Sequence, residues 1–498
     1  MSDIPRPWYR LRNMVLLLLL VILGIVGYQV WFAYTARPGS AINFNLRAQE
    51  ILDEVNPQPK GVANGWPHLV AAGEAWEHAD QAWKLSHPES EPAELDVIAW
   101  DEKGVVLAAA VDEYAALIGE EGGWAELDQF AASQWVRRPP SEGMLLEVLL
   151  PDLSWARSLA RIAAALMTRD FADGNDSAAL HRFDTLLAIG SGYTRQAWLI
   201  EHLVGYAIVD LACQRLREVM VHQDLSASTL ASIDEILARR LPLGTPDVAF
   251  DGERLMMYDV IQRTHTDDGH GDGRFLLYEF QQFGVLGPAV GGQQGVIPAL
   301  GRLVNVSHLA FPSKKQTMAR ADDFYDRFIQ AARMTRAARL ANPPITDAEI
   351  ETSLNTHSDL ILRILMPALG NFVEMHDQVI MRTRATRLMV AIERYRAAHG
   401  APPDTLASLV PDFIAAIPAD PYDNAEGFRY RRLNEGEAHF GCRGYLLYTI
   451  ARDGTDDLGV PPTRITLDDD DTEREVVDQA GALKNGEGDW VVNLPWQQ

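Results

Sequence analysis

An uncharged apolar run near the amino end constrains this chain more than any other feature of its sequence. Residues Met14–Ala33 (MVLLLLLVILGIVGYQVWFA) contain no charged side chain. At about 1.5 Å per residue, a helix of this length spans about 30 Å, the thickness of the hydrocarbon layer of a bilayer. Tyr28 and Trp31 lie near its far end, where aromatic rings suit a membrane interface. We therefore expect a transmembrane helix over residues 14–34 that contacts the lipid bilayer.

The residues around this helix predict its orientation. Arg6, Arg10 and Arg12 precede it, and positive residues are enriched on the cytoplasmic side of membrane helices. We expect residues 1–13 to form a cytoplasmic tail and the bulk of the chain to be extracytoplasmic. The alternative is a cleaved signal peptide, but large residues such as Trp31 occupy the place where a cleavage site needs small ones. The sequence therefore favours an uncleaved signal-anchor.

The composition argues against a nucleic-acid-binding protein and against a protein held together by disulfides or a four-cysteine zinc site. The 498 residues carry 44 Lys and Arg against 69 Asp and Glu, a formal net charge of −25. Binding to nucleic acid needs a concentration of Lys and Arg that neutralises phosphates, so we expect no nucleic-acid partner. The two cysteines, Cys213 and Cys442, are too few for a disulfide framework or a four-cysteine zinc site. We expect both to be buried free thiols.

Residues 35–370 carry the patterns of amphipathic helices. Segments such as 153–167 and 197–220 have apolar residues spaced by three and four positions, which places them on one face of a helix. Thr346 and Glu349 form a T-x-x-E capping box that predicts the start of another helix. We expect a mainly helical extracytoplasmic region here.

The pattern changes from residue 371 onward. A long helix is expected up to His399 and is ended by Gly400, a residue that favours helix termini. Aromatic and branched residues at 428–432 and 445–450 then predict strands. The fold class that follows is mainly α, with an N-terminal transmembrane helix, a helical outer region and a small C-terminal α+β module with an antiparallel sheet. The module is expected over residues 371–460 and an acidic tail over 461–498, with a further strand possible at 490–494.

Within this module, about seventy residues carry an ordered set of motifs. The strings AIERYRAAHGAPPDTLASLVPDFIAAIPADPYD, FRYRR and GYLLYTIARDGTDD place a long helix, a short helix, an Asp420-Pro421 turn and an Asp-Gly loop in succession. In this order the block resembles the soluble part of type II secretion major pseudopilins, a block that is also appended to uncharacterised bacterial envelope proteins. The apolar helix lies more than 300 residues ahead of the block and contains no acidic residue, unlike that of a pilin subunit. The resemblance therefore implies a shared module and not a filament subunit.

The same resemblance implies a calcium site. In the pseudopilins the terminal loop holds calcium, and the matching positions here are Asp453, Asp456 and Asp457. Calcium takes six to eight oxygen ligands, which closely spaced carboxylates and nearby carbonyls begin to supply. The alternative is a solvated Asp-Gly turn without a metal.

A second acidic loop lies between two predicted helices in the middle of the chain. Counted from Asp268, it has Asp272 at position 5 and Glu279 at position 12, as an EF-hand calcium loop does. We therefore expect calcium ligands at Asp268, Asp272 and Glu279. His270 at position 3 and Leu276 at position 9 depart from that pattern.

Two other interpretations of this loop stay open. Asp and Gly favour turns and helix caps, so the loop is also explained as a polar connection between helices. Alternatively, the carboxylates of Asp267–Asp272 form a cluster with His265 or His270 as a base, since paired carboxylates can share acid and base roles.

These features favour a structural or interaction role at the cell envelope, with a protein partner there. The sequence contains no His-Glu-x-x-His pair and no Gly-x-Ser-x-Gly elbow, so the prediction leans away from an enzyme. One alternative is a membrane-anchored hydrolase that uses the Asp267–Asp272 loop. Another is an accessory component of a secretion or pilus-like system.

Overall fold

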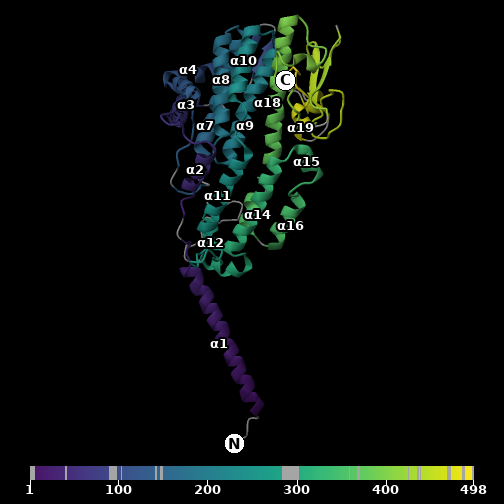
Figure 1. The fold of residues 1–498 in the computed structure, drawn as a ribbon. Helices are drawn as coiled ribbons and strands as arrows, with labels where there is room; N and C mark the ends of the chain where they lie inside the picture. Colours follow the sequence, from purple (N-terminus) through teal and green to yellow (C-terminus); the bar gives the residue numbers. More distant parts are fainter. Residues whose placement is uncertain are drawn as a thin grey trace.

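A long helix projects from a tall body of packed helices in the computed structural model of the chain (Figure 1). The structure describes residues 6–495 apart from 40–41, 89–97, 102–103, 141–142, 146–149, 283–301, 358, 367–368, 370, 424–425, 435–436, 438, 468–472 and 485–487. The carboxyl end lies in the part of the body farthest from the projecting helix.

The projecting helix is α1 (Arg6–Thr35). Its segment Leu11–Thr35 is long and apolar enough to span a membrane, and its side chains are exposed except near the body. The predicted apolar N-terminal helix is therefore confirmed. The helix begins at Arg6 and not at Met14 as expected, so Arg6, Arg10 and Arg12 lie within its first turns.

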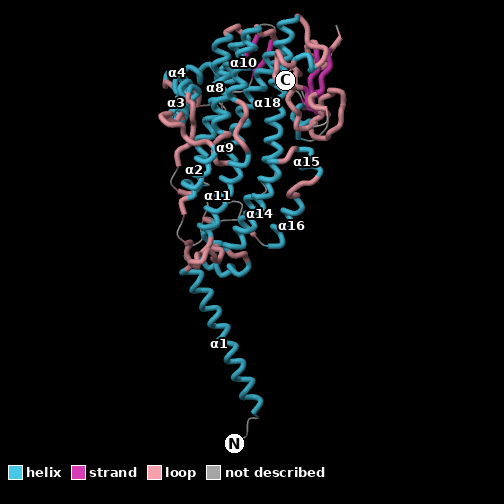
Figure 2. Tube along the Cα trace, viewed as in Figure 1, coloured by secondary structure: helices cyan, strands magenta, loops and turns pink. Residues whose placement is uncertain are grey.

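Helices fill most of the body, and strands gather near its far end (Figure 2). The helical region contains α2 (Phe44–Val55), α3 (Trp66–Ser86), α4 (Ala109–Glu120), α5 (Gly123–Ala132), α7 (Leu150–Ala172), α8 (Asp176–Tyr193), α9 (Leu199–His222), α10 (Ala227–Arg240), α11 (Pro246–Thr264), α12 (Leu277–Gln281), the 3-10 helix η2 (Arg302–Ala310), α14 (Lys314–Arg333), α15 (Arg336–Ala341), α16 (Asp347–His357) and α17 (Leu360–Leu365). One β-hairpin, β1 (Ile98–Asp101) with β2 (Gly104–Leu107), also lies in this region.

Helix α9 lies at the centre of the body and packs against α7, α8, α11 and α18. Two glycines let α8 and α9 approach closely. A Cβ atom at Gly205 of α9 would lie 2.6 Å from the carbonyl oxygen of Gly190 of α8, closer than packed atoms allow. The residues around this crossing, including Ile208, Val209 and Ala212, are fully buried or nearly so. The backbone contact therefore holds the core of the body together by close packing.

The carboxyl end forms a small mixed module around a long helix. It contains α18 (Phe372–His399), η4 (Leu406–Leu409), β3 (Arg429–Arg432), β4 (Tyr445–Thr449), β5 (Thr463–Leu467), β6 (Glu473–Val477), α19 (Gln479–Lys484) and β7 (Trp490–Val491). The sheet has the order β3-β4-β7 with antiparallel pairs, and β5 and β6 form a separate hairpin. Gly400 ends α18 with a φ of +79°, a backbone conformation that glycine tolerates best. The predicted fold class, mainly α with a small C-terminal antiparallel sheet, is confirmed.

Charged side chains join this module to the helical region. The buried Arg217 of α9 donates to Thr386 Oγ1 of α18 (2.7 Å), and its guanidinium lies 5.1 Å from the ring centre of Trp490 in β7. Arg443 donates to the carbonyl of Val221 (3.1 Å), at the end of α9. The sheet is thus fixed against the helices that position the rest of the body.

Candidate functional site

The acidic loop of residues 265–276 connects α11 to α12 and folds back on itself. The amide of Asp268 donates to the carbonyl of Asp272 (2.9 Å), which closes the loop. The carbonyl of Gly273 accepts from the amide of Lys314 (3.0 Å), the first residue of α14. The loop is therefore a closed turn seated on the amino end of a helix.

The carboxylates of this loop accept hydrogen bonds from backbone amides. Asp268 Oδ1 accepts from the amides of His270 (2.8 Å) and Asp272 (3.1 Å). Asp272 Oδ1 accepts from the amide of Lys315 (3.0 Å), in the first turn of α14. An anion is favoured there because the first helical turn leaves amides unsatisfied and carries the positive end of the helix dipole. The geometry thus explains these two carboxylates as parts of a turn and a helix cap.

The structure does not gather the three predicted ligands of this loop into one shell. Glu279 lies on α12, where burial raises its pKa and Arg37 opposes that shift. Across the described parts of the chain, no group of three or more His, Cys, Asp or Glu side chains is placed to hold a metal ion. Calcium at Asp268, Asp272 and Glu279 stays a prediction without support from this arrangement.

The loop also lacks the raised pKa that a carboxylic acid catalyst needs at neutral pH. A hydrogen bond from Lys314 lowers the pKa of Asp267, and the backbone amides that Asp268 accepts from lower the pKa of that carboxyl. His265 is only 1% exposed, and burial lowers its pKa to about 4. The two carboxylates are therefore ionised and the imidazole is neutral and buried. This arrangement does not favour the hydrolase interpretation.

The predicted ligands of the C-terminal loop lie between β4 and β5. Asp453 Oδ1 accepts from the amide two residues later (2.9 Å), as in an ordinary turn. Asp456 Oδ1 accepts from Tyr448 Oη (3.0 Å) and from the amide two residues later (2.9 Å). The backbone carbonyl of Asp457 accepts from the amide of Val460 (3.2 Å).

The sequence does not mark out Asp489, yet its carboxyl is the most unusual group beside this loop. The residue is 0% exposed, and its Oδ2 accepts from the amide of Gly459 (2.8 Å). Its Oδ1 is buried without a hydrogen-bond partner in the described residues. Burial raises the pKa of Asp489 to about 7, and the negative charges of Asp456 and Asp457 add to the shift. The sequence could not link Asp489 to this loop, because Asp489 lies more than thirty residues after Asp457.

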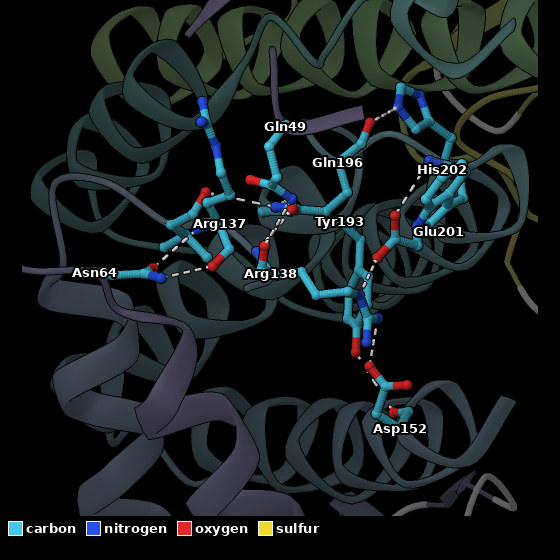
Figure 3. Close-up of polar contacts among 12 residues, drawn as sticks. Gln49, Asn64, Arg137, Arg138, Asp152, Tyr193, Gln196, Glu201 and His202 are labelled. Carbon is cyan, nitrogen blue, oxygen red and sulfur yellow. Dashed lines mark hydrogen bonds and ion pairs between the residues drawn. The ribbon is translucent and has the colours of Figure 1, made fainter. Parts of the chain in front are cut away.

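A buried polar network surrounds Arg138 in the middle of the body (Figure 3). The guanidinium of Arg138 pairs with Asp152 of α7 and with Glu201 of α9, the latter at 2.6 Å. Its amide donates to Gln196 Oε1 (3.0 Å), and its carbonyl accepts from Gln49 Nε2 of α2 (3.2 Å). One arginine thereby connects α2, α7, α9 and the segment between α8 and α9.

Neighbouring residues extend this network on both sides of Arg138. Arg137 pairs with Asp53 and donates to the carbonyl of Leu52 (2.8 Å), near the end of α2. On the other side, a ring nitrogen of His202 lies 3.0 Å from the carbonyl of Gln196. Most polar groups of the network have partners within it, as buried polar groups need, but His202 Nδ1 is buried without a hydrogen-bond partner among the described residues.

At the centre of the network, Asp152 and Glu201 share the single guanidinium of Arg138. Asp152 and Glu201 raise the pKa of Arg138, although burial opposes them, so the guanidinium stays charged. Glu201 is 0% exposed, and burial raises its pKa to about 7 against the pull of Arg138. Burial also lowers the pKa of His202 to about 4. The cluster can therefore take up a proton on Glu201 near neutral pH, while His202 is neutral.

The space beside this network is too small for a substrate. The cleft lined by Arg138, Trp198 and Glu201 has a volume of about 10 Å³, roughly the room that one water molecule needs. We therefore interpret the network as a structural connection between helices. The consecutive Arg137-Arg138-Pro139-Pro140 is the one signal in the sequence that could have pointed to it.

No protein-family model, curated protein or solved structure matches the chain. Its function is therefore inferred from the geometry of the chain itself.

Proposed function

We propose that this chain is a single-pass membrane-anchored protein of structural or interaction type, whose body is held in a fixed position at the extracytoplasmic face of the membrane. The observation that carries the proposal is the junction between α1 and the body. The junction is packed, and it determines where the body lies relative to the apolar helix.

The last turns of α1 are buried against the body, unlike the rest of the helix. Phe32, Ala33 and Ala36 are buried, and Phe32 and Ala36 form an apolar cluster with Leu276. The ring of Phe32 lies 4.2 Å from the ring of His308 in η2, measured between ring centres. Burial of this turn favours an uncleaved anchor, because removal of the helix would expose the apolar cluster to water.

The segment that follows α1 is also held by the body. The side-chain amide of Gln262 in α11 donates to the carbonyl of Ile42 and accepts from its amide, both at 2.8 Å. At Gly39 a Cβ atom would lie 2.5 Å from the Cβ of Asp267, so the backbone passes close to the acidic loop. The segment between α1 and α2 is thus held by the body at Phe32 and again at Ile42, so the position of the membrane helix determines the position of the body.

Limited proteolysis of the full-length protein in detergent micelles tests this junction. Trypsin cleavage after Arg47, an exposed arginine in the first turn of α2, should release an amino-terminally tagged fragment slowly in the wild type and several times faster in Phe32→Ala and Gln262→Ala. The reason is that cleavage requires the local chain to open, and both changes make opening easier. Gln330→Ala, an exposed glutamine on α14, serves as the matched control. Equal cleavage rates in all four proteins would show that the junction is not held.

A calcium site in the C-terminal loop is a second proposal, and the buried Asp489 carboxyl favours it. Asp489 Oδ1 is buried without a hydrogen-bond partner in the described residues, and a cation there would offset the negative charges of Asp456 and Asp457 that raise its pKa. Carboxylate oxygens of this kind suit calcium. The loop would then be rigidified by metal for contact with an envelope partner.

A role as an accessory component of a secretion or pilus-like system depends on the resemblance of the C-terminal block alone. It stays a prediction, and crosslinking with purified secretion components would test it.

A further inference from the structure

A pocket of about 300 Å³ opens where separate segments of the body meet. The segments are the end of α2, the end of α5 with the residues after it, α8 with the residues after it, and the connection from α10 to α11. Such a volume lies at the lower end of the range for ligand pockets, which is roughly 300–1,000 Å³. The pocket is lined by Val55, Asn56, Phe130, Ser133, Gln134, Trp135, Val136, Ala188, Ser191, Gly192, Arg195, Arg240, Leu243, Gly244 and Thr245.

Arg195 is the cation of this pocket that has no acidic partner. Within the described residues, its guanidinium makes no ion pair and no hydrogen bond, and the residue is exposed. Arg240, by contrast, donates to both carboxylate oxygens of Asp184 (2.7 and 2.8 Å) and to the carbonyl of Ala131 (2.8 Å). Arg239 also pairs with Asp184 (2.8 Å). Arg239 and Arg240 therefore share the one carboxylate of Asp184, and Arg195 has none, in a chain whose formal net charge is −25.

The two lining arginines are near neighbours. Desolvation beside the pocket wall lowers the pKa of Arg195, and the positive charge of Arg240 adds to this shift. Arg195 and Arg240 are also the titratable side chains among the described residues that line the pocket. An anion between them would relieve their repulsion and accept the donors that Arg195 leaves unused.

The remaining wall combines apolar surface with small polar groups. Phe130, Trp135 and Leu243 supply the apolar part. The hydroxyls of Ser133 and Ser191 donate to the backbone carbonyls of Gln129 and Ala188, at 2.8 and 3.3 Å, which leaves their oxygens as acceptors only. The side-chain amides of Asn56 and Gln134 also line the pocket, but Arg195 supplies the charged donors that no other described group takes up, and the apolar wall suits a short hydrocarbon group.

We infer that this pocket binds a carboxylate carried on a short apolar group, with Arg195 as the residue that recognises the charge. Arg240 is a positioning residue, since its Nε and Nη2 donate to Asp184 and Ala131. Two sources share this chemistry, namely a free organic acid and the carboxyl-terminal residue of a partner chain. The inference goes beyond the membrane-anchored role and does not depend on it.

Isothermal titration calorimetry of the full-length protein in detergent micelles tests the site with two matched pairs of probes. One pair is hexanoate and hexanamide, and the other is N-acetyl-Gly-Gly-Leu with a free carboxylate and the same peptide with a carboxyl-terminal amide. The acids should bind and the amides should bind at least about tenfold more weakly, because only the acids offer Arg195 a charge-assisted hydrogen bond. Tighter binding of the peptide acid would identify a partner chain as the source, and tighter binding of hexanoate a free acid.

Variants separate recognition by Arg195 from general attraction of anions. Arg195→Gln should weaken binding of the acids about tenfold or more, whereas Arg333→Gln, an exposed arginine elsewhere on the body, should leave it unchanged. Arg195→Gln should keep the melting temperature of the wild type, because the guanidinium has no partner in the body to lose. Absence of binding, equal binding of acid and amide, or equal affinity in Arg195→Gln would overturn the inference.

Discussion

At the residue scale, Arg138 shows how a strongly acidic chain keeps charge inside its body. The guanidinium contacts both Asp152 and Glu201 and lies 4.5 Å from the ring centre of Trp66. Removing one member of such a network is expected to be costly, because the remaining buried charge loses its partner. None of these pairings follows from local sequence, since Arg138 and Glu201 are 63 residues apart.

The raised pKa of Glu201 predicts a pH dependence of stability. Its folded pKa of about 7 lies above its ordinary value of 4.5, so the folded state holds this proton more tightly than the unfolded state. The stabilisation from that proton is complete below pH 4.5 and is lost as the pH rises through about 7. Glu201→Gln imitates the protonated form and should not show this loss.

The melting temperature of wild type relative to Glu201→Gln should therefore fall between pH 5 and pH 8. Thermal unfolding followed by circular dichroism at both pH values measures it. Because other groups titrate identically in the two proteins, the difference between them isolates Glu201. A difference that does not vary with pH would show that Glu201 is already ionised at pH 5.

At the element scale, the residues that begin and end helices were predictable from sequence. The capping box predicted at Thr346 is present, since Thr346 N donates to Glu349 Oε2 (2.9 Å) and Glu349 N donates to Thr346 Oγ1 (3.2 Å). Gly400 ends α18 as expected. These signals are local, because a cap involves residues three or four positions apart. The β1–β2 hairpin and the β5–β6 hairpin were not expected, because their strands are short and lack a strong alternating pattern.

The C-terminal loop provides the element-scale test of calcium binding. If Asp489 completes a site, calcium should raise the melting temperature of the full-length protein relative to EGTA. At a hundredfold excess of calcium over its dissociation constant, the free energy of unfolding should rise by about 2.7 kcal/mol. Asp489→Asn should abolish the increase, whereas Asp268→Asn should retain it, which separates this loop from the loop after α11. An increase that survives Asp489→Asn, or no increase in the wild type, would contradict the proposed site.

At the scale of the whole molecule, the sequence predicted an apolar N-terminal helix, a helical region and a small terminal sheet because each has its own periodicity or composition. It did not predict how these parts are joined. The connection after α1 depends on Gln262 and Ile42, which are 220 residues apart, and on the ring contact between Phe32 and His308. Contacts of this kind arise from tertiary packing and leave no local pattern.

We propose that α1 crosses a membrane with the body on the extracytoplasmic side. Labelling of introduced cysteines in intact cells with a membrane-impermeant maleimide reports on which side each part of the chain lies. The native Cys213 and Cys442 are both buried, so the background should be low. Leu85, which is 83% exposed on the body, and Ser2, in the amino-terminal tail, are suitable positions.

We predict that Leu85→Cys is labelled in intact cells and that Ser2→Cys is labelled only after lysis. Labelling of Ser2→Cys and protection of Leu85→Cys in intact cells would contradict the proposed orientation.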